Sequence, residues 1–140
     1  RHTDQDIIMH FQSIGRISPK IWQNMNWLRF HRNSDSVERH KNKFPDKYQM
    51  LKVAENVVNN KYNGGDQRFF LYVDIDSEKI LGDISPEMMS EAIDDFVSLN
   101  HNHVVKPYKN KRDAKGKKIH TPESAILEAK KILRQNISDV

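Results

Sequence analysis

The sequence predicts an α+β domain in which about five helices pack around a small sheet of two to three strands. Ser or Thr precedes Pro at three places, each followed by apolar residues at helical spacing. One continuous run of aromatic and branched residues, 69–75, is typical of a strand. A length of 140 residues suits one compact domain with one core. We therefore expect a single domain over 1–140, with a helical N-terminal part (1–66) and a strand-containing C-terminal part (67–140).

Three helices are predicted to begin at Ser-Pro or Thr-Pro pairs. In such a pair the hydroxyl caps the helix, and the N–H that Pro lacks would have had no helical partner in any case. The pairs are Ser18-Pro19, Ser85-Pro86 and Thr121-Pro122. The first predicts a helix over about 19–31, and the apolar spacing after the other two predicts two further amphipathic helices.

Two more helices are predicted in the N-terminal part. Thr3 followed by Asp6 resembles a capping box, and a helix from there would end at Gly15. Its apolar stripe consists of Ile7, Phe11 and Ile14. Another helix opens at Pro45 and ends at a Gly-Gly pair. The polar segment 32–44 is interpreted as a loop.

The strands are predicted in the second half of the chain. The run 69–75 is apolar almost throughout, which indicates a strand buried on both faces. A turn after it allows a partner strand at about 80–84, so that the two form a hairpin. A third, short strand is predicted at 103–105, ended by a Pro. The segment 109–118 is interpreted as a flexible basic loop.

Composition excludes several classes of protein. The chain has no Cys, which excludes disulfides, thiolate catalysis and Cys-based zinc sites. No apolar run approaches the roughly 18 residues needed to cross a bilayer, and no signal-peptide pattern opens the chain, so we expect a soluble protein without a membrane partner. Because no Met stands first, the chain is interpreted as a processed or excised portion of a longer protein. Walker, Rossmann, zinc-finger, serine-elbow and metalloprotease patterns are absent from the sequence.

Charge is segregated into three blocks along the chain. Residues 1–70 carry 12 Lys and Arg against 7 Asp and Glu, residues 71–100 carry 1 against 8, and residues 101–140 carry 10 against 4. The two basic blocks favour polyanionic partners, of which nucleic acid is the commonest. The alternative is that the blocks neutralise one another across the folded surface.

A group of His, Lys, Tyr and Thr residues is the first candidate active site. It consists of His101, His103, Lys106, Tyr108, His120 and Thr121. In an extended chain His101 and His103 would lie on one face. A ribonuclease that uses no metal needs a general base, a general acid and a cation that stabilises the developing phosphorane charge, and this group supplies all three. The alternative is a set of surface histidines at a strand edge, with Thr121 acting only as an N-cap.

Asp74 and Asp76 form the second candidate site. Two carboxylates at positions i and i+2 of a strand point to the same side, where they can hold a divalent metal such as Mg²⁺. The alternative is ordinary turn chemistry, since Asp-Ser is common directly after a strand. We expect no other cofactor.

The N-terminal helices loosely match a helix-turn-helix. Gly15 would lie at the turn, and the second helix would present Gln23, Asn26 and Arg29 to a DNA groove. Phe11 argues against this match, because it occupies a position where close helix packing favours a small residue.

Two basic stretches are candidate nucleic-acid contacts. The first contains Arg29, Arg32, Arg39, Lys41 and Lys43, with Trp22, Trp27, Phe30 and Phe44 nearby. Aromatic rings interleaved with cations are typical of proteins that bind single-stranded nucleic acid, whereas the alternative places these rings in the core and the cations in solvent. The second contains Lys109, Lys111, Arg112, Lys117 and Lys118. It lacks aromatic residues apart from Tyr108, which indicates phosphate contacts or a mobile linker.

The leading hypothesis is a domain that acts on nucleic acid, with cleavage of RNA or DNA at the His-centred site and no metal. The first alternative is a non-catalytic DNA-binding or RNA-binding module that uses the N-terminal helices. The second is a protein-interaction domain whose acidic segment 74–95 docks on a basic partner.

Overall fold

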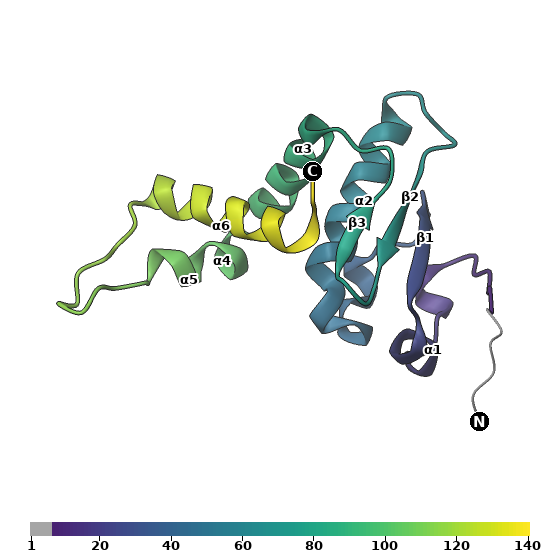
Figure 1. The fold of residues 1–140 in the computed structure, drawn as a ribbon, viewed down its shortest axis with the longest axis horizontal. Coiled ribbons are helices and arrows are strands. Elements are labelled where there is room, and N and C mark those ends of the chain that lie inside the picture. Colours follow the sequence, from purple (N-terminus) through teal and green to yellow (C-terminus); the bar gives the residue numbers. More distant parts are fainter. Residues whose placement is uncertain (1–6) are drawn as a thin grey trace.

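A three-stranded antiparallel sheet with a long helix behind it forms one half of the molecule, and a helical arm extends from it (Figure 1). The computed structural model describes residues 7–140. In chain order the α-helices, strands and 3-10 helices (η) are η1 (Ile14–Arg16), α1 (Pro19–Asn24), β1 (Trp27–His31), η2 (Glu38–Lys43), η3 (Pro45–Lys47), α2 (Tyr48–Asn63), β2 (Phe70–Asp74), β3 (Lys79–Leu81), α3 (Pro86–Leu99), α4 (His101–Val104), α5 (Lys106–Lys109) and α6 (Pro122–Ile137). The predicted α+β class is confirmed.

The sheet has the strand order β1-β2-β3 and covers α2 with one face only. Phe30 pairs with Leu71, and Val73 pairs with Ile80. These side chains are buried, whereas their neighbours along each strand are exposed or half-buried. Alternate residues of a strand point to opposite faces, so β1 and β2 have one face on the core and one face in solvent.

Helix α2 lies at the centre of the core. Buried residues occupy most of the circumference of α2, because the sheet packs on one side of the helix and α3 on another. The helix begins directly after the 3-10 turn at Pro45 and ends at Gly64. The buried apolar side chains of the described residues form a single cluster, which includes Val105 of the arm and Leu133 of α6.

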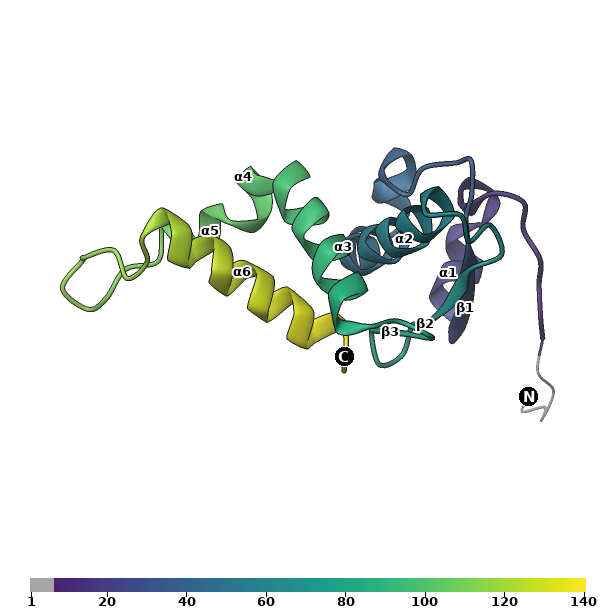
Figure 2. The ribbon, with the colours of Figure 1, turned by 90° about the horizontal axis from the view of Figure 1, so that it is seen from above.

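The helical arm is built from α3, α4, α5 and α6, and a loop between α5 and α6 forms its tip (Figure 2). The hydroxyl of Ser85 caps α3 by accepting from the N–H of Met88 at 3.2 Å, and Thr121 caps α6 in the same way. Helix α6 runs back from the tip to the sheet, where the Lys79 ammonium of β3 donates to the Gln135 carbonyl at 2.8 Å. The arm is therefore anchored to β3 at its base.

Several predicted elements are confirmed. Helices follow Pro45, Pro86 and Pro122, and residues 70–81 form an antiparallel hairpin. In the described part of the chain, no helix is long and apolar enough to cross a membrane.

The expected helical N-terminal part is wrong in two places. The capping box at Thr3 lies outside the described residues, but residues 7–13 are not helical, so the helix that would end at Gly15 does not form. The helix predicted over 19–31 ends at Asn24, and Trp27–His31 form the strand β1 instead. Aromatic residues and a β2 partner some 40 residues away favour the strand over the local helical spacing. Because the first helix does not form and the second ends before Asn26 and Arg29, the helix-turn-helix hypothesis has no structural basis.

Two further predictions are corrected in the C-terminal half. The segment 103–105 is not a strand. His101–Val104 form the short helix α4, which begins two residues after the end of α3, and Val105 directly after α4 is buried. No neighbouring strand edge is paired with it, and its backbone N–H groups are satisfied by local helical bonds. The strand β2 is buried on one face only, with Tyr72 exposed. The predicted loop 32–44 includes η2.

Candidate nucleic-acid interface

The solvent-facing side of the sheet carries a cluster of aromatic and basic side chains, which we call the outer sheet face. It consists of Trp27, Arg29 and His31 from β1 with Phe70 and Tyr72 from β2. The strand register sets Arg29 opposite Tyr72 and His31 opposite Phe70. Side chains of directly opposed residues are neighbours on one face. Period-two alternation along both strands therefore brings the five side chains to one surface, together with the Asp74 carboxylate, which lies opposite Trp27.

Phe70 is the centre of this cluster. The guanidinium carbon of Arg29 lies 3.9 Å from the centre of the Phe70 ring, and the His31 ring stacks on Phe70 with centroids 5.5 Å apart. The Tyr72 ring meets Phe70 edge-on at 5.7 Å. Trp27 and Tyr72 remain 54% and 40% exposed. Cation–π and aromatic contacts hold the central residues in place, whereas the two outer rings present apolar surface to solvent.

Burial, with the nearby Arg29 guanidinium as the lesser cause, holds the pKa of His31 below its ordinary value. At neutral pH the His31 ring is therefore an uncharged stacking surface with one N–H donor. Arg29 supplies the positive charge of the outer sheet face. A second arginine, Arg32, lies over the Tyr62 ring at 4.4 Å.

The other cations of the first basic stretch lie in η2. Arg39 pairs with the Asp35 carboxylate at 3.5 Å, Lys43 donates to the Gly15 carbonyl, and Lys41 is exposed. Three aromatic residues of that stretch belong to the core and present no stacking surface. They are Trp22, Phe30 and Phe44. Of the aromatic residues named for this stretch, Trp27 alone is exposed, and its aromatic neighbours come from β2.

A polar cluster around Asp35 was not predicted. Its carboxylate accepts hydrogen bonds from the Ser13 hydroxyl, from His40 Nε2 at 2.7 Å and from the Gly15 N–H at 3.3 Å. The Ser13 hydrogen bond, followed by that of His40, lowers the pKa of Asp35. Ser13 donates to the carboxylate and not to the imidazole, so the arrangement lacks the Ser-to-His contact that activates a nucleophile. The cluster instead ties η1 to η2, and its members are too far apart in sequence to show a motif.

The histidines of the predicted active site have three different sets of neighbours. His101 and His103 lie in a helix, where two residues correspond to a rotation of about 200° around the helix axis. Their side chains therefore do not share a face, as they would in an extended chain. The Lys109 ammonium lies 2.9 Å from His101 Nε2. His103 and Tyr108 line a cleft of about 210 Å³ between the arm helices and the start of α2. His101 is not among the residues lining this cleft.

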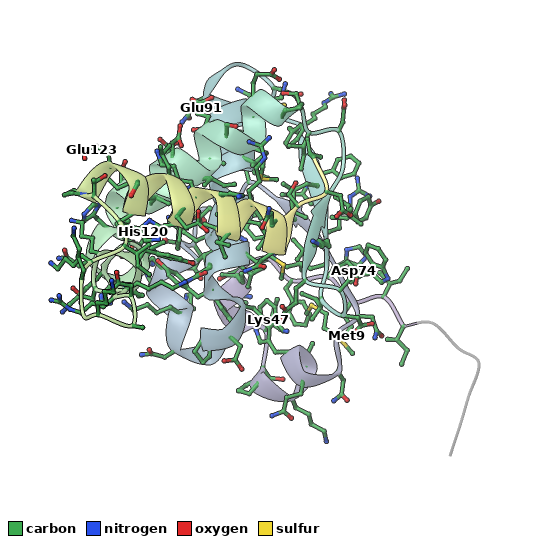
Figure 3. All side chains as sticks on the ribbon, turned by 60° about the vertical axis from the view of Figure 1, so that its left-hand side comes forward. Met9, Lys47, Asp74, Glu91, His120 and Glu123 are labelled. Atoms are coloured by element: carbon green, nitrogen blue, oxygen red, sulfur yellow. The ribbon has the colours of Figure 1, made fainter. Side chains whose placement is uncertain are left out.

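Two of the remaining members of that group, His120 and Thr121, lie at the start of α6. His120 Nδ1 lies 3.2 Å from the Ser124 hydroxyl, and the Thr121 hydroxyl accepts from the Ser124 N–H at 3.1 Å. Lys106 is exposed in α5. Thr121 therefore acts as an N-cap, as the alternative interpretation expects. Figure 3 shows His120 and Asp74 on opposite sides of the molecule.

The two carboxylates considered for a metal site take part in the turn after β2. Asp74 Oδ1 accepts from the N–H groups of Asp76 and Ser77 at 3.1 and 3.2 Å, and the hydrogen bonds from Ser77 lower the pKa of Asp74. Asp76 Oδ2 accepts from Asn26 at 2.9 Å. Within residues 7–140, no group of three or more His, Cys, Asp or Glu side chains is arranged to hold a metal ion. The geometry favours turn chemistry at this Asp-x-Asp pair.

The charged blocks do not neutralise one another as a whole. In the described part of the chain one ion pair, Lys130 with Asp94 at 3.0 Å, joins the acidic helix α3 to the second basic block. The second basic stretch, residues 109–118, forms the loop at the tip of the arm, and we call it the basic finger (Figure 1). It holds the predicted residues Lys109, Lys111, Arg112, Lys117 and Lys118.

Comparison with known proteins shows no relationship: no protein-family model, no curated protein and no solved structure matches this chain. Functional inference therefore depends on the geometry of the chain itself.

Proposed function

We propose that this protein binds single-stranded nucleic acid on the outer sheet face. The observation that carries the proposal is the stack of Arg29, Phe70 and His31, flanked by the exposed rings of Trp27 and Tyr72. Antiparallel sheets with exposed aromatic residues on one face are a recurrent platform for unpaired bases, because every base has a π-face that can stack on a ring.

The chemistry of the face favours a polyanion over an apolar protein partner. Exposed aromatic surface that is rimmed by polar groups marks an interaction site, because a monomer gains nothing from leaving it in water. Here the rings alternate with a fixed guanidinium, and the chain carries a net charge of +4. A partner that offers flat rings and negative charge together matches this surface, and single-stranded nucleic acid does so.

Each side chain has a separate role in this proposal. Trp27 and Tyr72 stack on bases with their exposed faces. Arg29 uses one face for Phe70 and keeps its N–H groups for a phosphate. His31 extends the stacking surface and donates one hydrogen bond. Together they allow binding at unpaired bases without reading their sequence.

The geometry favours binding without cleavage. His101, His103 and His120 have separate partners, and the Thr121 hydroxyl is engaged as a helix cap. Cleavage at the His-centred site stays a prediction. Docking of the acidic segment 74–95 on a basic protein likewise stays a prediction.

The test is an anisotropy titration of fluorescein-labelled 12-nucleotide (dT) and (U) strands at low salt. We expect the wild-type protein to bind both, and a Trp27→Ala/Tyr72→Ala variant to lose roughly 5- to 150-fold in affinity for each ring removed, at about 1–3 kcal/mol per stacked base. Both residues are exposed, so the variant should fold normally. A Leu99→Ala/Leu127→Ala variant removes two even more exposed apolar side chains, from α3 and α6, and should bind as the wild type does. Wild-type affinity in the ring variant, or no binding by the wild type, would overturn the proposal.

A further inference from the structure

The basic finger is a second cationic surface, at the far end of the arm from β1 (Figure 2). Six of its ten residues are Lys or Arg, and every residue from 110 to 118 is exposed. The cations are Lys109, Lys111, Arg112, Lys115, Lys117 and Lys118. Asp113 is the single acidic residue of the finger.

The finger has an ordered backbone. Asp113 Oδ1 accepts from the N–H groups of Lys115 and Lys117 at 2.8 and 3.0 Å, and the Asp113 N–H donates to the Lys117 carbonyl at 2.9 Å. Gly116 takes a positive φ of 79° at the turn, and its carbonyl accepts from the Arg112 guanidinium at 2.8 Å. The lone carboxylate is thus used to hold the turn together. The segment predicted to be a flexible loop therefore contains a hydrogen-bonded turn, which orders the backbone from which its cations extend.

Within the described residues, the cations of the finger lack carboxylate partners, although Arg112 donates to the Gly116 carbonyl and Lys109 lies 2.9 Å from His101 Nε2. Among residues 7–140, none of the six forms an ion pair with a carboxylate. Like charges held this close repel one another, and a bound polyanion relieves the repulsion and releases its own counterions. The finger contains no aromatic residue. It can contact phosphates but cannot stack on bases.

We propose that the basic finger is a sequence-independent phosphate site that grips the backbone of the same strand whose bases stack on the outer sheet face. This inference rests on the proposed function. A membrane surface is the less suitable polyanion, because the finger has no large apolar side chain to enter the lipid, and only Ile119 follows it.

The distance between the two sites sets the length of strand that can reach both. Helix α6 spans the gap from the finger, next to Thr121, to β3, next to Gln135. Its 16 residues rise ~1.5 Å each, which gives about 24 Å. The outer sheet face lies on β1 and β2, up to about 10 Å beyond β3, so about seven to ten nucleotides span the gap at one phosphate per roughly 3.4 Å of stacked strand. A strand of four nucleotides reaches one site, and a strand of twenty reaches both.

The experiment compares labelled (dT)₄ and (dT)₂₀ with a finger variant that combines Lys111→Gln, Arg112→Gln, Lys117→Gln and Lys118→Gln. We expect the variant to bind (dT)₄ within about twofold of the wild type, because about 24 Å exceeds the Debye length of roughly 10 Å at 0.1 M salt. Its affinity for (dT)₂₀ should fall at least about tenfold. The slope of log K against log salt should flatten by about 3, for four lost contacts at roughly 0.7 each. A control variant with Lys20→Gln, Lys47→Gln, Arg68→Gln and Lys131→Gln changes the net charge equally and should bind (dT)₂₀ within about threefold of the wild type.

The possible failures are distinguishable. If the finger variant binds (dT)₂₀ normally while Trp27→Ala/Tyr72→Ala does not, the finger inference is overturned and the sheet proposal stands. If the sheet variant binds both strands normally, the proposed function fails. If only binding to phosphatidylserine vesicles depends on the finger, its partner is a membrane and the inference is wrong.

Discussion

The Arg29 guanidinium carbon lies over the Phe70 ring, 3.9 Å from its centre, and so links the two strands that form the outer sheet face. This contact fixes the position of a charge that a free arginine in solvent would leave mobile. It also covers one face of Phe70, whereas Trp27 and Tyr72 of the same surface stay exposed to solvent.

Replacing Arg29 separates charge from stacking. Arg29→Ala should weaken the binding of (dT)₁₂ by about tenfold and reduce the salt slope by roughly 0.7, the value for one phosphate contact. Arg29→Lys keeps the charge but not the planar contact, so the slope should stay while affinity falls by a smaller factor. Titrations at four salt concentrations measure both quantities. Equal slopes for wild type and Arg29→Ala would show that Arg29 contacts no phosphate.

Binding should depend on pH through His31. Its pKa is held below the ordinary value in the free protein, and a nearby phosphate favours the protonated ring. Binding then takes up a proton, so affinity for (dT)₁₂ should rise as the pH falls from about 7.5 to about 5.5. His31→Gln should remove this part of the dependence. A pH profile that is the same in both proteins would contradict a phosphate contact at His31.

A buried ion pair fixes the loop that follows β1. Glu55 accepts from the Lys52 ammonium at 2.6 Å and from the Val37 N–H at 2.8 Å, and all three residues are buried. Glu55→Ala leaves a buried ammonium and a buried N–H without partners, which should lower the free energy of unfolding by about 3–5 kcal/mol. Urea denaturation measures this change. The exposed Glu38→Ala is the control and should cost less than about 0.5 kcal/mol; a similar loss in both variants would contradict the role of Glu55.

The Asp35 cluster should make stability depend on acid. Because hydrogen bonds hold the pKa of the Asp35 carboxyl below its ordinary value, the unfolded state binds a proton more readily than the folded state. The stabilisation is present above that value and is lost as the pH falls through the folded-state pKa. The difference in Tm between wild type and Asp35→Ala should therefore shrink between pH 7 and pH 2. A constant difference would show that the charged form of Asp35 has no special role.

Gly15 offers a second way to test the same cluster. A Cβ at this position would lie 2.5 Å from the His40 ring and 2.8 Å from the Asp35 carboxylate. Gly15→Ala should therefore displace these side chains and destabilise the protein by about 1–3 kcal/mol. The comparison variant is the exposed Gly64→Ala, at a φ of −80°, where a Cβ would come no closer than 3.3 Å to a neighbouring atom and the cost should be smaller. Equal stability of Gly15→Ala and the wild type would contradict the close packing.

Helices with local start signals could be predicted from the sequence, whereas the sheet face could not. Ser85 and Thr121 cap their helices through neighbours three residues away, so the signal is local. The strand β1 depends on β2, whose residues are some 40 positions later, and Trp27 to His31 also fit helical spacing. In a helix over 19–31, residues 27, 29 and 31 would not share one face. In the strand β1 they do, and this places Arg29 beside Phe70. The sequence thus predicts a surface of aromatic and cationic side chains, and Trp27 belongs to it. Three of the other rings that it names are core residues: Trp22, Phe30 and Phe44.

The strand that would set His101 and His103 on one face does not form, for a related reason. Apolar Val104 and Val105 suggested a strand, but with no strand edge beside them they pack in a helical arm. The Asp35 cluster joins residues up to 22 positions apart and has no sequence signal. Contacts made by the tertiary fold decide both outcomes.

Photo-crosslinking tests the central proposal most directly. A (dT)₁₂ strand that carries 5-iodouracil at one central position is bound to the wild-type protein, irradiated, and the crosslinked residue is identified by mass spectrometry of the peptides. The proposal predicts crosslinks at Trp27, Phe70 or Tyr72, which are lost in the Trp27→Ala/Tyr72→Ala variant. Crosslinks confined to segments outside β1 and β2, from a strand that binds tightly, would contradict it.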